Sequence, residues 1–74
     1  MSVGISEKQR VYNYICLFIL GNKYPPTLRE IADGTKMSAS RVGKMVKLLE
    51  KDGRITRKKG KPRTIVIQYS KEKE

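Results

Sequence analysis

Histidine and tryptophan are absent from this chain, and cysteine occurs only once, at Cys16. Without histidine, the chain has no Ser-His or Cys-His pair for nucleophilic catalysis, and it cannot assemble a His/Cys set around a metal ion. A single thiol also forms no internal disulfide. The few acidic residues are scattered, and no glycine-rich phosphate loop is present. We therefore expect neither enzymatic activity nor a bound metal or cofactor.

Long apolar runs are missing as well. The apolar stretch Tyr14–Leu20 is much shorter than the roughly 20 residues that cross a bilayer, and no signal-peptide cleavage site follows it. The sequence contains no internal repeat and no interdomain linker. We expect a cytoplasmic protein without a membrane partner. It should form one domain over residues 1–74, with flexible ends at 1–5 and 70–74.

Acidic residues are scarce relative to basic ones. The chain has 17 Lys and Arg against 7 Asp and Glu, a formal net charge of +10 at pH 7. The usual partners of so basic a small domain are polyanions such as DNA, RNA or an acidic membrane surface. The cations gather in two neighbouring segments, 41–51 and 57–63. This clustering favours a binding surface over a charge that only provides solubility.

The most informative stretch is 38–53, which predicts an amphipathic helix. Ser38 is a good N-cap residue, and Gly53 stands where a left-handed residue would end the helix. The positions expected on the buried side recur at helical spacing and are Val42, Met45, Val46 and Leu49. The opposite side carries Ser40, Lys44, Lys47 and Lys51.

The first predicted helix begins at Ser6, which with Gln9 matches a capping box, and ends near Leu20 at the pair Gly21-Asn22. It is apolar on two sides, of which a domain this small can cover only one. One side carries Val11, Ile15, Phe18 and Ile19, and the other carries Cys16, Leu17 and Leu20. For this second stripe three alternatives stay open. The hairpin strands or the C-terminal tail pack over it, it forms a homodimer interface, or it is an exposed patch left by missing partner domains.

A second, shorter helix is predicted after the rigid connector Pro25-Pro26. Thr27 and Glu30 have the spacing of another capping box. Residues 34–36 form a turn into the helix at 38–52, so the two helices make a helix-turn-helix. Beyond Gly53 the apolar period changes to two, which predicts strands at 54–57 and 64–69 around a turn at 58–63. The expected fold class is α+β, a winged helix-turn-helix with three helices followed by a two-stranded hairpin.

The run at 24–32, YPPTLREIA, resembles the PPT-x-x-EIA signature in the second helix of the LexA repressor family's N-terminal DNA-binding domain. The resemblance extends from about Ser6 to Ile67. It implies a winged helix-turn-helix that binds double-stranded DNA as a dimer through its third helix. The self-cleaving second domain of the family is absent from these 74 residues, so we do not expect autoproteolysis or the DNA-damage switch to transfer.

Two departures from the family pattern limit what the resemblance implies. The usual glycine of the turn is Lys36 here, with Gly34 placed earlier. The family's base-reading positions correspond to Ser38, Ser40, Arg41, Gly43 and Lys44, and only Ser38 matches the family residue. The operator sequence of the family therefore cannot be carried over.

Arg41 is the candidate for guanine readout, since its planar fork matches O6 and N7 together. The alternative roles for Arg41 are a phosphate contact or a pair with an acidic residue. The lysines are expected to position the protein on the backbone, and the hairpin to contact backbone or minor groove. The residues expected to contact double-stranded DNA are Thr27, Arg29, Ser38, Ser40, Arg41, Lys44, Lys47, Arg57, Lys58, Lys59, Lys61 and Arg63.

The sequence thus favours a sequence-specific transcriptional regulator, more in keeping with a repressor than an activator. Two other functions stay open. One is a protein-interaction adaptor that docks through the apolar side of the first helix. The other is a nucleic-acid-binding architectural protein without sequence preference.

Overall fold

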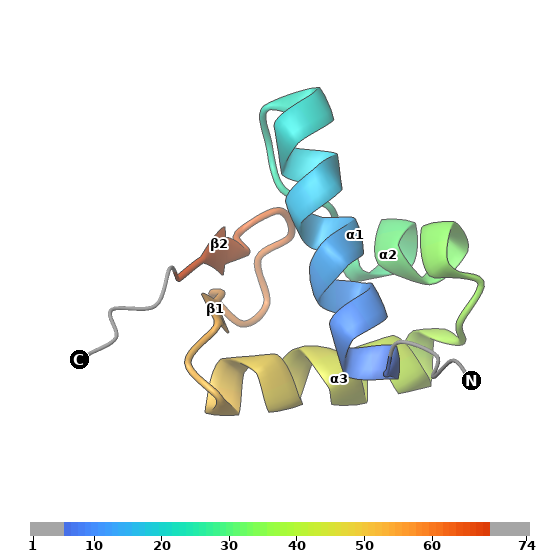
Figure 1. Ribbon diagram of the computed structural model, residues 1–74. Helices are drawn as coiled ribbons and strands as arrows, with labels where there is room; N and C mark the ends of the chain where they lie inside the picture. The colour runs from blue at the N-terminus through green and yellow to red at the C-terminus, as the bar shows by residue number, and fades with distance from the viewer. Residues whose placement is uncertain (1–5, 69–74) are drawn as a thin grey trace.

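The computed structural model describes residues 6–68, and the expected flexible ends lie outside this range. Three helices precede a two-stranded antiparallel sheet, which confirms the predicted α+β class (Figure 1). None of the helices within 6–68 is long and apolar enough to cross a membrane. The elements are α1 (Glu7–Asn22), α2 (Leu28–Thr35), α3 (Ala39–Lys51), β1 (Ile55–Thr56) and β2 (Val66–Ile67).

The three helices all contact one another, and α3 also contacts β1. In Figure 1 α1 stands upright over α3, with α2 on one side and the hairpin on the other. The hairpin is shorter than predicted, because only Ile55↔Ile67 and Thr56↔Val66 pair. Beyond these pairs the Lys58 backbone N–H donates to Thr64 Oγ1 at 2.9 Å, so a side chain replaces the next ladder bond.

All three predicted N-caps are present. The hydroxyl oxygens of Ser6, Thr27 and Ser38 each accept a hydrogen bond from the amide three residues on. Glu30 returns the bond to the Thr27 amide, which confirms the second capping box. The first box is only half formed, because the Gln9 side chain does not accept from the Ser6 amide. Its Nε2 donates to Asn13 and its Oε1 accepts from Arg54.

The helix ends differ from the prediction at two of three places. Gly21 and Asn22 continue α1, and Lys23 ends it with a left-handed φ of 71°. Gly34 likewise belongs to α2, which ends at Lys36 with φ 60°. Lysine here takes a conformation for which glycine was expected. At α3 the prediction is confirmed. Gly53 has φ 78°, its amide bonds to the Glu50 carbonyl and the next amide to the Leu49 carbonyl, as in a Schellman motif.

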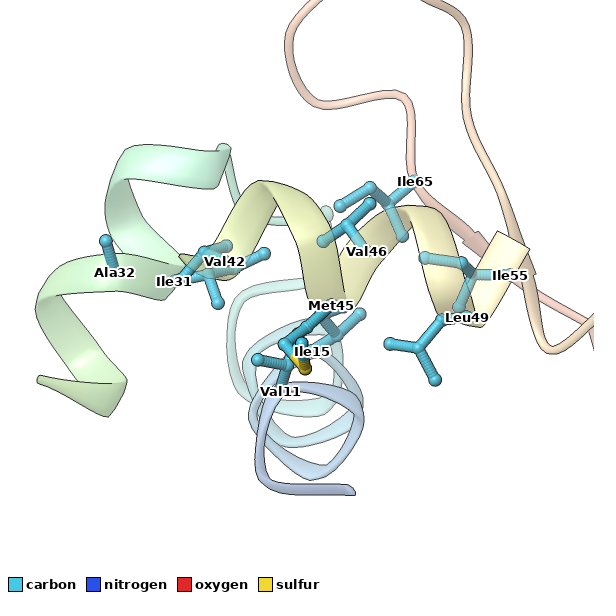
Figure 2. Close-up of a cluster of buried hydrophobic side chains, with 10 residues drawn as sticks. All are labelled: Val11, Ile15, Ile31, Ala32, Val42, Met45, Val46, Leu49, Ile55 and Ile65. Atoms are coloured by element: carbon cyan, nitrogen blue, oxygen red, sulfur yellow. The ribbon is translucent and has the colours of Figure 1, made fainter. Parts of the chain in front are cut away.

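The core lies where the three helices meet and is closed by the hairpin (Figure 2). The predicted stripe of α3 is buried in full, and β1 and the segment before β2 each add an isoleucine. Burial of these apolar side chains is the main favourable term in the stability of the fold. The core residues are Val11, Ile15, Ile31, Ala32, Val42, Met45, Val46, Leu49, Ile55 and Ile65.

The packing of α1 on α2 requires the absence of a side chain at Gly34. A Cβ atom at this position would overlap the ring of Tyr14. The Tyr14 ring also packs against Phe18, with centroids 5.9 Å apart, so it cannot move without disturbing a second ring. Gly34, which lies in the helix rather than the turn, thus sets the close approach of the two helices.

We expect Gly34→Ala to lower the free energy of unfolding by about 1–3 kcal/mol, because the Tyr14 ring must be displaced from a packed site. Gly43→Ala is the matched control, since a Cβ at Gly43 in α3 meets no atom within 4 Å. That variant should raise stability by about 0.5–1 kcal/mol. Urea denaturation followed by circular dichroism measures both, and equal effects of the two substitutions would contradict this account.

Candidate nucleic-acid interface

The start of α3 is open to solvent. Ser38, Ser40, Arg41 and Lys44 are exposed and line a shallow hollow of about 250 Å³. Ser38 is held by its capping role, since its Oγ accepts from the Arg41 amide at 3.1 Å. Polar hydroxyls and two cationic side chains therefore surround the first turns of this helix. Such a helix end can enter a DNA groove without first displacing a protein element.

Along the rest of α3, the solvent side is cationic. Lys44, Lys47 and Lys51 are exposed, and none of their side chains has an ion-pair or hydrogen-bond partner within residues 6–68. Leu48 is also 43% exposed and adds an apolar side chain to this side. The arrangement follows from burial of the apolar stripe on the other side, which leaves only one orientation for the lysines.

Arg41 forms an ion pair with a residue of α1. Its Nε lies 3.2 Å from Oε1 of Glu7 in the first turn of that helix, and both side chains are about half exposed. An ion pair this exposed adds little to stability. The contact is one of the alternatives considered for Arg41 from the sequence, although Glu7 was not identified as the partner. The two terminal nitrogens of the Arg41 guanidinium donate no hydrogen bond within residues 6–68.

The hairpin cations divide into free lysines and paired arginines. Lys58, Lys59 and Lys61 are exposed and have no side-chain partner in the described range. The Arg57 Nε donates to Oε1 of Glu50 at 3.1 Å, and its side chain is only 16% exposed. This pair links the hairpin to α3, so the Arg57 side chain is less accessible to a ligand than the three lysines.

Arg63 makes the most extensive contacts of any predicted site residue. Its two terminal nitrogens donate to the two carboxylate oxygens of Glu30, each at 2.9 Å. One of them also donates to the Pro25 carbonyl at 3.2 Å, and the guanidinium lies 4.8 Å from the centre of the Tyr24 ring. The hydrogen bonds from Arg63, with that from the Thr27 amide, hold the pKa of Glu30 below its ordinary value.

The start of α2 lies beside the hairpin turn. Thr27 lines a hollow of about 270 Å³ there, together with Lys58, Lys61 and Arg63. The Thr27 hydroxyl accepts from the Glu30 amide at 3.1 Å, so this predicted site residue is primarily a cap. Arg29 is exposed and has no partner within 6–68. Of the two predicted site residues at the start of α2, Thr27 therefore lies beside the lysines of the hairpin turn, and Arg29 does not line this hollow.

The second stripe of α1 stays largely uncovered by the described residues. Leu17 is 67% and Leu20 69% exposed, and Cys16 is partly buried. The strands β1 and β2 leave the two leucines exposed, so the alternative in which the hairpin strands pack over this stripe is wrong. The C-terminal tail, the other cover considered, lies outside the described range.

A helix-turn-helix followed by a hairpin, with an unneutralised cationic side, defines a DNA-binding domain of the winged helix-turn-helix class. Residues 3–64 match the family model described as LexA DNA binding domain. The chain belongs to this family. The match ends before β2, so the returning strand of the hairpin lies outside it.

Curated relatives support the same assignment. The chain is 34% identical over 70 residues to a LexA repressor of Mycobacterium leprae, covering 92% of this chain and 30% of the relative. It is 42% identical over 64 residues to a LexA repressor of Clostridium botulinum, covering 85% and 32%. A LexA repressor of Clostridium perfringens is 39% identical over 70 residues, covering 90% and 34%. The chain spans about a third of the length of these relatives.

The ion pairs predict a loss of stability in acid. The folded-state pKa of Glu30 lies below its ordinary value of 4.5 because of Arg63, so the stabilisation is fully present above about pH 4.5. It is lost as the pH falls through the folded pKa. The pKa of Asp52 is lowered in the same sense by Lys8, from 3.8.

We expect the free energy of unfolding to decline below about pH 4.5, and Glu30→Gln and Asp52→Asn each to flatten that decline. Urea denaturation at a series of pH values between 2.5 and 7 measures the effect. A Glu30→Gln profile parallel to that of the unmodified chain would contradict the assigned role of the Glu30–Arg63 pair.

Proposed function

We propose that this chain binds double-stranded DNA in a sequence-specific manner and acts in the cytoplasm as a transcriptional repressor. The observation that carries the proposal is the exposed start of α3, where Ser38, Ser40, Arg41 and Lys44 surround an open hollow. In helix-turn-helix proteins this end of the recognition helix contacts base edges in the major groove. Membership of the LexA DNA binding domain family and the repressor names of the relatives support the same function.

The free lysines supply the sequence-independent part of binding. Duplex DNA carries about one negative charge per 1.7 Å of axis, and its neutralisation by cations releases condensed counterions. Lys44 and Lys47 on α3, and Lys58, Lys59 and Lys61 on the hairpin, would pair with phosphates without breaking an ion pair of the described structure. Binding should therefore weaken steeply as the salt concentration rises.

Arg41 supplies the sequence-dependent part. Its terminal nitrogens form a planar fork that can donate to O6 and N7 of one guanine. The Glu7 carboxylate is paired with Nε, and no hydrogen bond within residues 6–68 occupies the terminal nitrogens, so the fork is available to a base. Ser40 lies beside it on the same exposed turn and would donate to a phosphate or a base edge.

Selection from a randomised duplex pool, sequenced after binding at two salt concentrations, tests this function. We expect a recovered motif that contains guanine, and Arg41→Ala should reduce discrimination at one base pair by about 5- to 150-fold. Lys51→Ala is the control because it removes the same charge from the far end of α3. That variant should weaken binding to all sequences alike.

The other outcomes identify the alternative functions. Salt-dependent binding without a motif would indicate an architectural protein and contradict specific recognition. Negligible binding at low salt would contradict DNA binding altogether and favour the adaptor hypothesis.

We further propose that the protein binds DNA as a homodimer through the second stripe of α1. Leu17 and Leu20 support this because they are the two most exposed large apolar side chains of the described structure. Two recognition helices would then meet successive major grooves about 34 Å apart on a near-palindromic site. Two leucines bury little area, so association should be weak in free solution and stronger on DNA.

Sedimentation at high micromolar concentration, with and without duplex, tests the dimer. Joint replacement Leu17→Ser and Leu20→Ser should abolish two-to-one complexes. Val66→Ser, which removes an exposed apolar side chain from β2, should leave them intact. A monomer under all conditions would contradict the proposal.

A further inference from the structure

The guanidinium of Arg63 is used almost completely by contacts inside the protein. It makes two parallel bonds of 2.9 Å to Glu30, a bond of 3.2 Å to the Pro25 carbonyl, and a face contact with Tyr24 at 4.8 Å. Parallel paired bonds of this kind are directional and available only to arginine. A phosphate could bind this fork only by displacing Glu30. Arg63 therefore does not resemble the free lysines that surround it in the sequence.

Glu30 links two elements with one carboxylate. Its Oε1 accepts from the Thr27 amide at 2.9 Å and from Arg63 at 2.9 Å, while Oε2 accepts the second Arg63 bond. The first bond completes the cap of α2, and the other two fix the end of the hairpin turn. The turn is thereby tied to the start of the helix that precedes the recognition helix.

The hairpin turn is itself held together by internal bonds. The Lys58 amide donates to Thr64 Oγ1 at 2.9 Å, and the Thr64 hydroxyl donates to the Lys61 carbonyl at 3.0 Å. The Lys61 amide in turn donates to the Lys58 carbonyl at 3.3 Å. Arg63 is next to Thr64 and has a left-handed φ of 58°. Fixing Arg63 therefore fixes the backbone that carries Lys58, Lys59 and Lys61.

We propose that Arg63 is a positioning residue, and that the Glu30–Arg63 pair clamps the hairpin turn to the start of α2 so that Lys58, Lys59 and Lys61 meet the DNA backbone as one ordered group. The inference deepens the proposed function and rests on it for its DNA-binding part. An ordered turn has less conformational entropy to lose when it docks. The unexpected consequence is that an acidic residue, Glu30, strengthens binding to a polyanion.

The direction in which DNA affinity changes on removal of the Glu30 charge distinguishes the clamp from a simple charge effect. Glu30→Gln removes a negative charge, so charge alone predicts tighter DNA binding, whereas the clamp predicts weaker binding. Glutamine can still accept the Thr27 amide, so the cap of α2 is kept. Arg63→Lys keeps the charge and removes the fork. A phosphate contact would survive that substitution, but the clamp would not.

We expect Glu30→Gln and Arg63→Lys each to weaken binding to a selected duplex by about two- to tenfold. The double variant should lose no more than either single variant, because the two residues act as a unit. The slope of log K against log [salt] should also become shallower. The change should exceed about 0.9, the contribution of one phosphate contact, because three lysines lose their ordered placement. Asp33→Asn is the charge control. It removes one acid from the same helix, and the Asp33 side chain has no ion pair or hydrogen bond within residues 6–68.

Tighter binding by Glu30→Gln, equal to that of Asp33→Asn, would overturn the clamp, as would full affinity in Arg63→Lys. A measurement without DNA separates this result from a failure of the proposed function. Amide hydrogen exchange at Lys58 should accelerate in both clamp variants and not in Asp33→Asn. Unchanged exchange would overturn the clamp even if the protein binds DNA. Accelerated exchange in a chain that does not bind DNA would support the clamp and contradict only the proposed function.

Discussion

Burial of the apolar stripe of α3 is the constraint on which the rest of the structure depends. Val42, Val46 and Leu49 are fully buried, and they contribute to the core that α1, α2 and the hairpin close. This packing fixes the rotation of the helix about its own axis. The lysines at the opposite positions must then face solvent, and the polar first turn must lie at an open end. The orientation needed for DNA binding therefore follows from the packing of the core.

The scarcity of acidic residues has a second structural consequence. Within residues 6–68, four of the five acidic side chains form ion pairs, and each pair joins two different parts of the fold. Glu7 and Asp52 join α1 to α3, Glu50 joins α3 to the hairpin, and Glu30 joins the hairpin to α2. Arginine is the cation in three of these pairs, where its fork or Nε edge gives a directional contact. The lysines of α3 and of the hairpin turn remain free for an external anion.

The local features could be predicted from the sequence because short-range rules determine them. The three caps and the buried stripe of α3 follow from residue type and from spacings of three and four residues. Helix ends were less predictable. The sequence predicts a helix end at Gly21 and a turn from Gly34, but both glycines lie inside helices, and Lys23 and Lys36 adopt the left-handed conformation instead. At Gly34 the reason is tertiary, since the ring of Tyr14 occupies the space of a side chain.

The location of the candidate site could be predicted from the sequence. Which of its cations are free and which form ion pairs could not. The sequence treats Arg57, Arg63 and the neighbouring lysines as one cationic group. The structure separates the two arginines, because Glu50 and Glu30 reach them from other elements. Glu30 lies 33 residues from Arg63 in the chain, a separation over which no local pattern carries information. The exposed second stripe of α1 was visible in the sequence, but nothing local indicated that the hairpin would leave it uncovered.

In the proposed function, the first turns of α3 and the lysines of the hairpin turn contact the same DNA duplex. Amide chemical-shift changes during titration of the ¹⁵N-labelled chain with a selected duplex test it most directly. We expect large changes at 38–44 and 58–61, and changes near Leu17 and Leu20 only where two copies meet on one duplex. Changes confined to α1, with 38–44 unaffected, would contradict it.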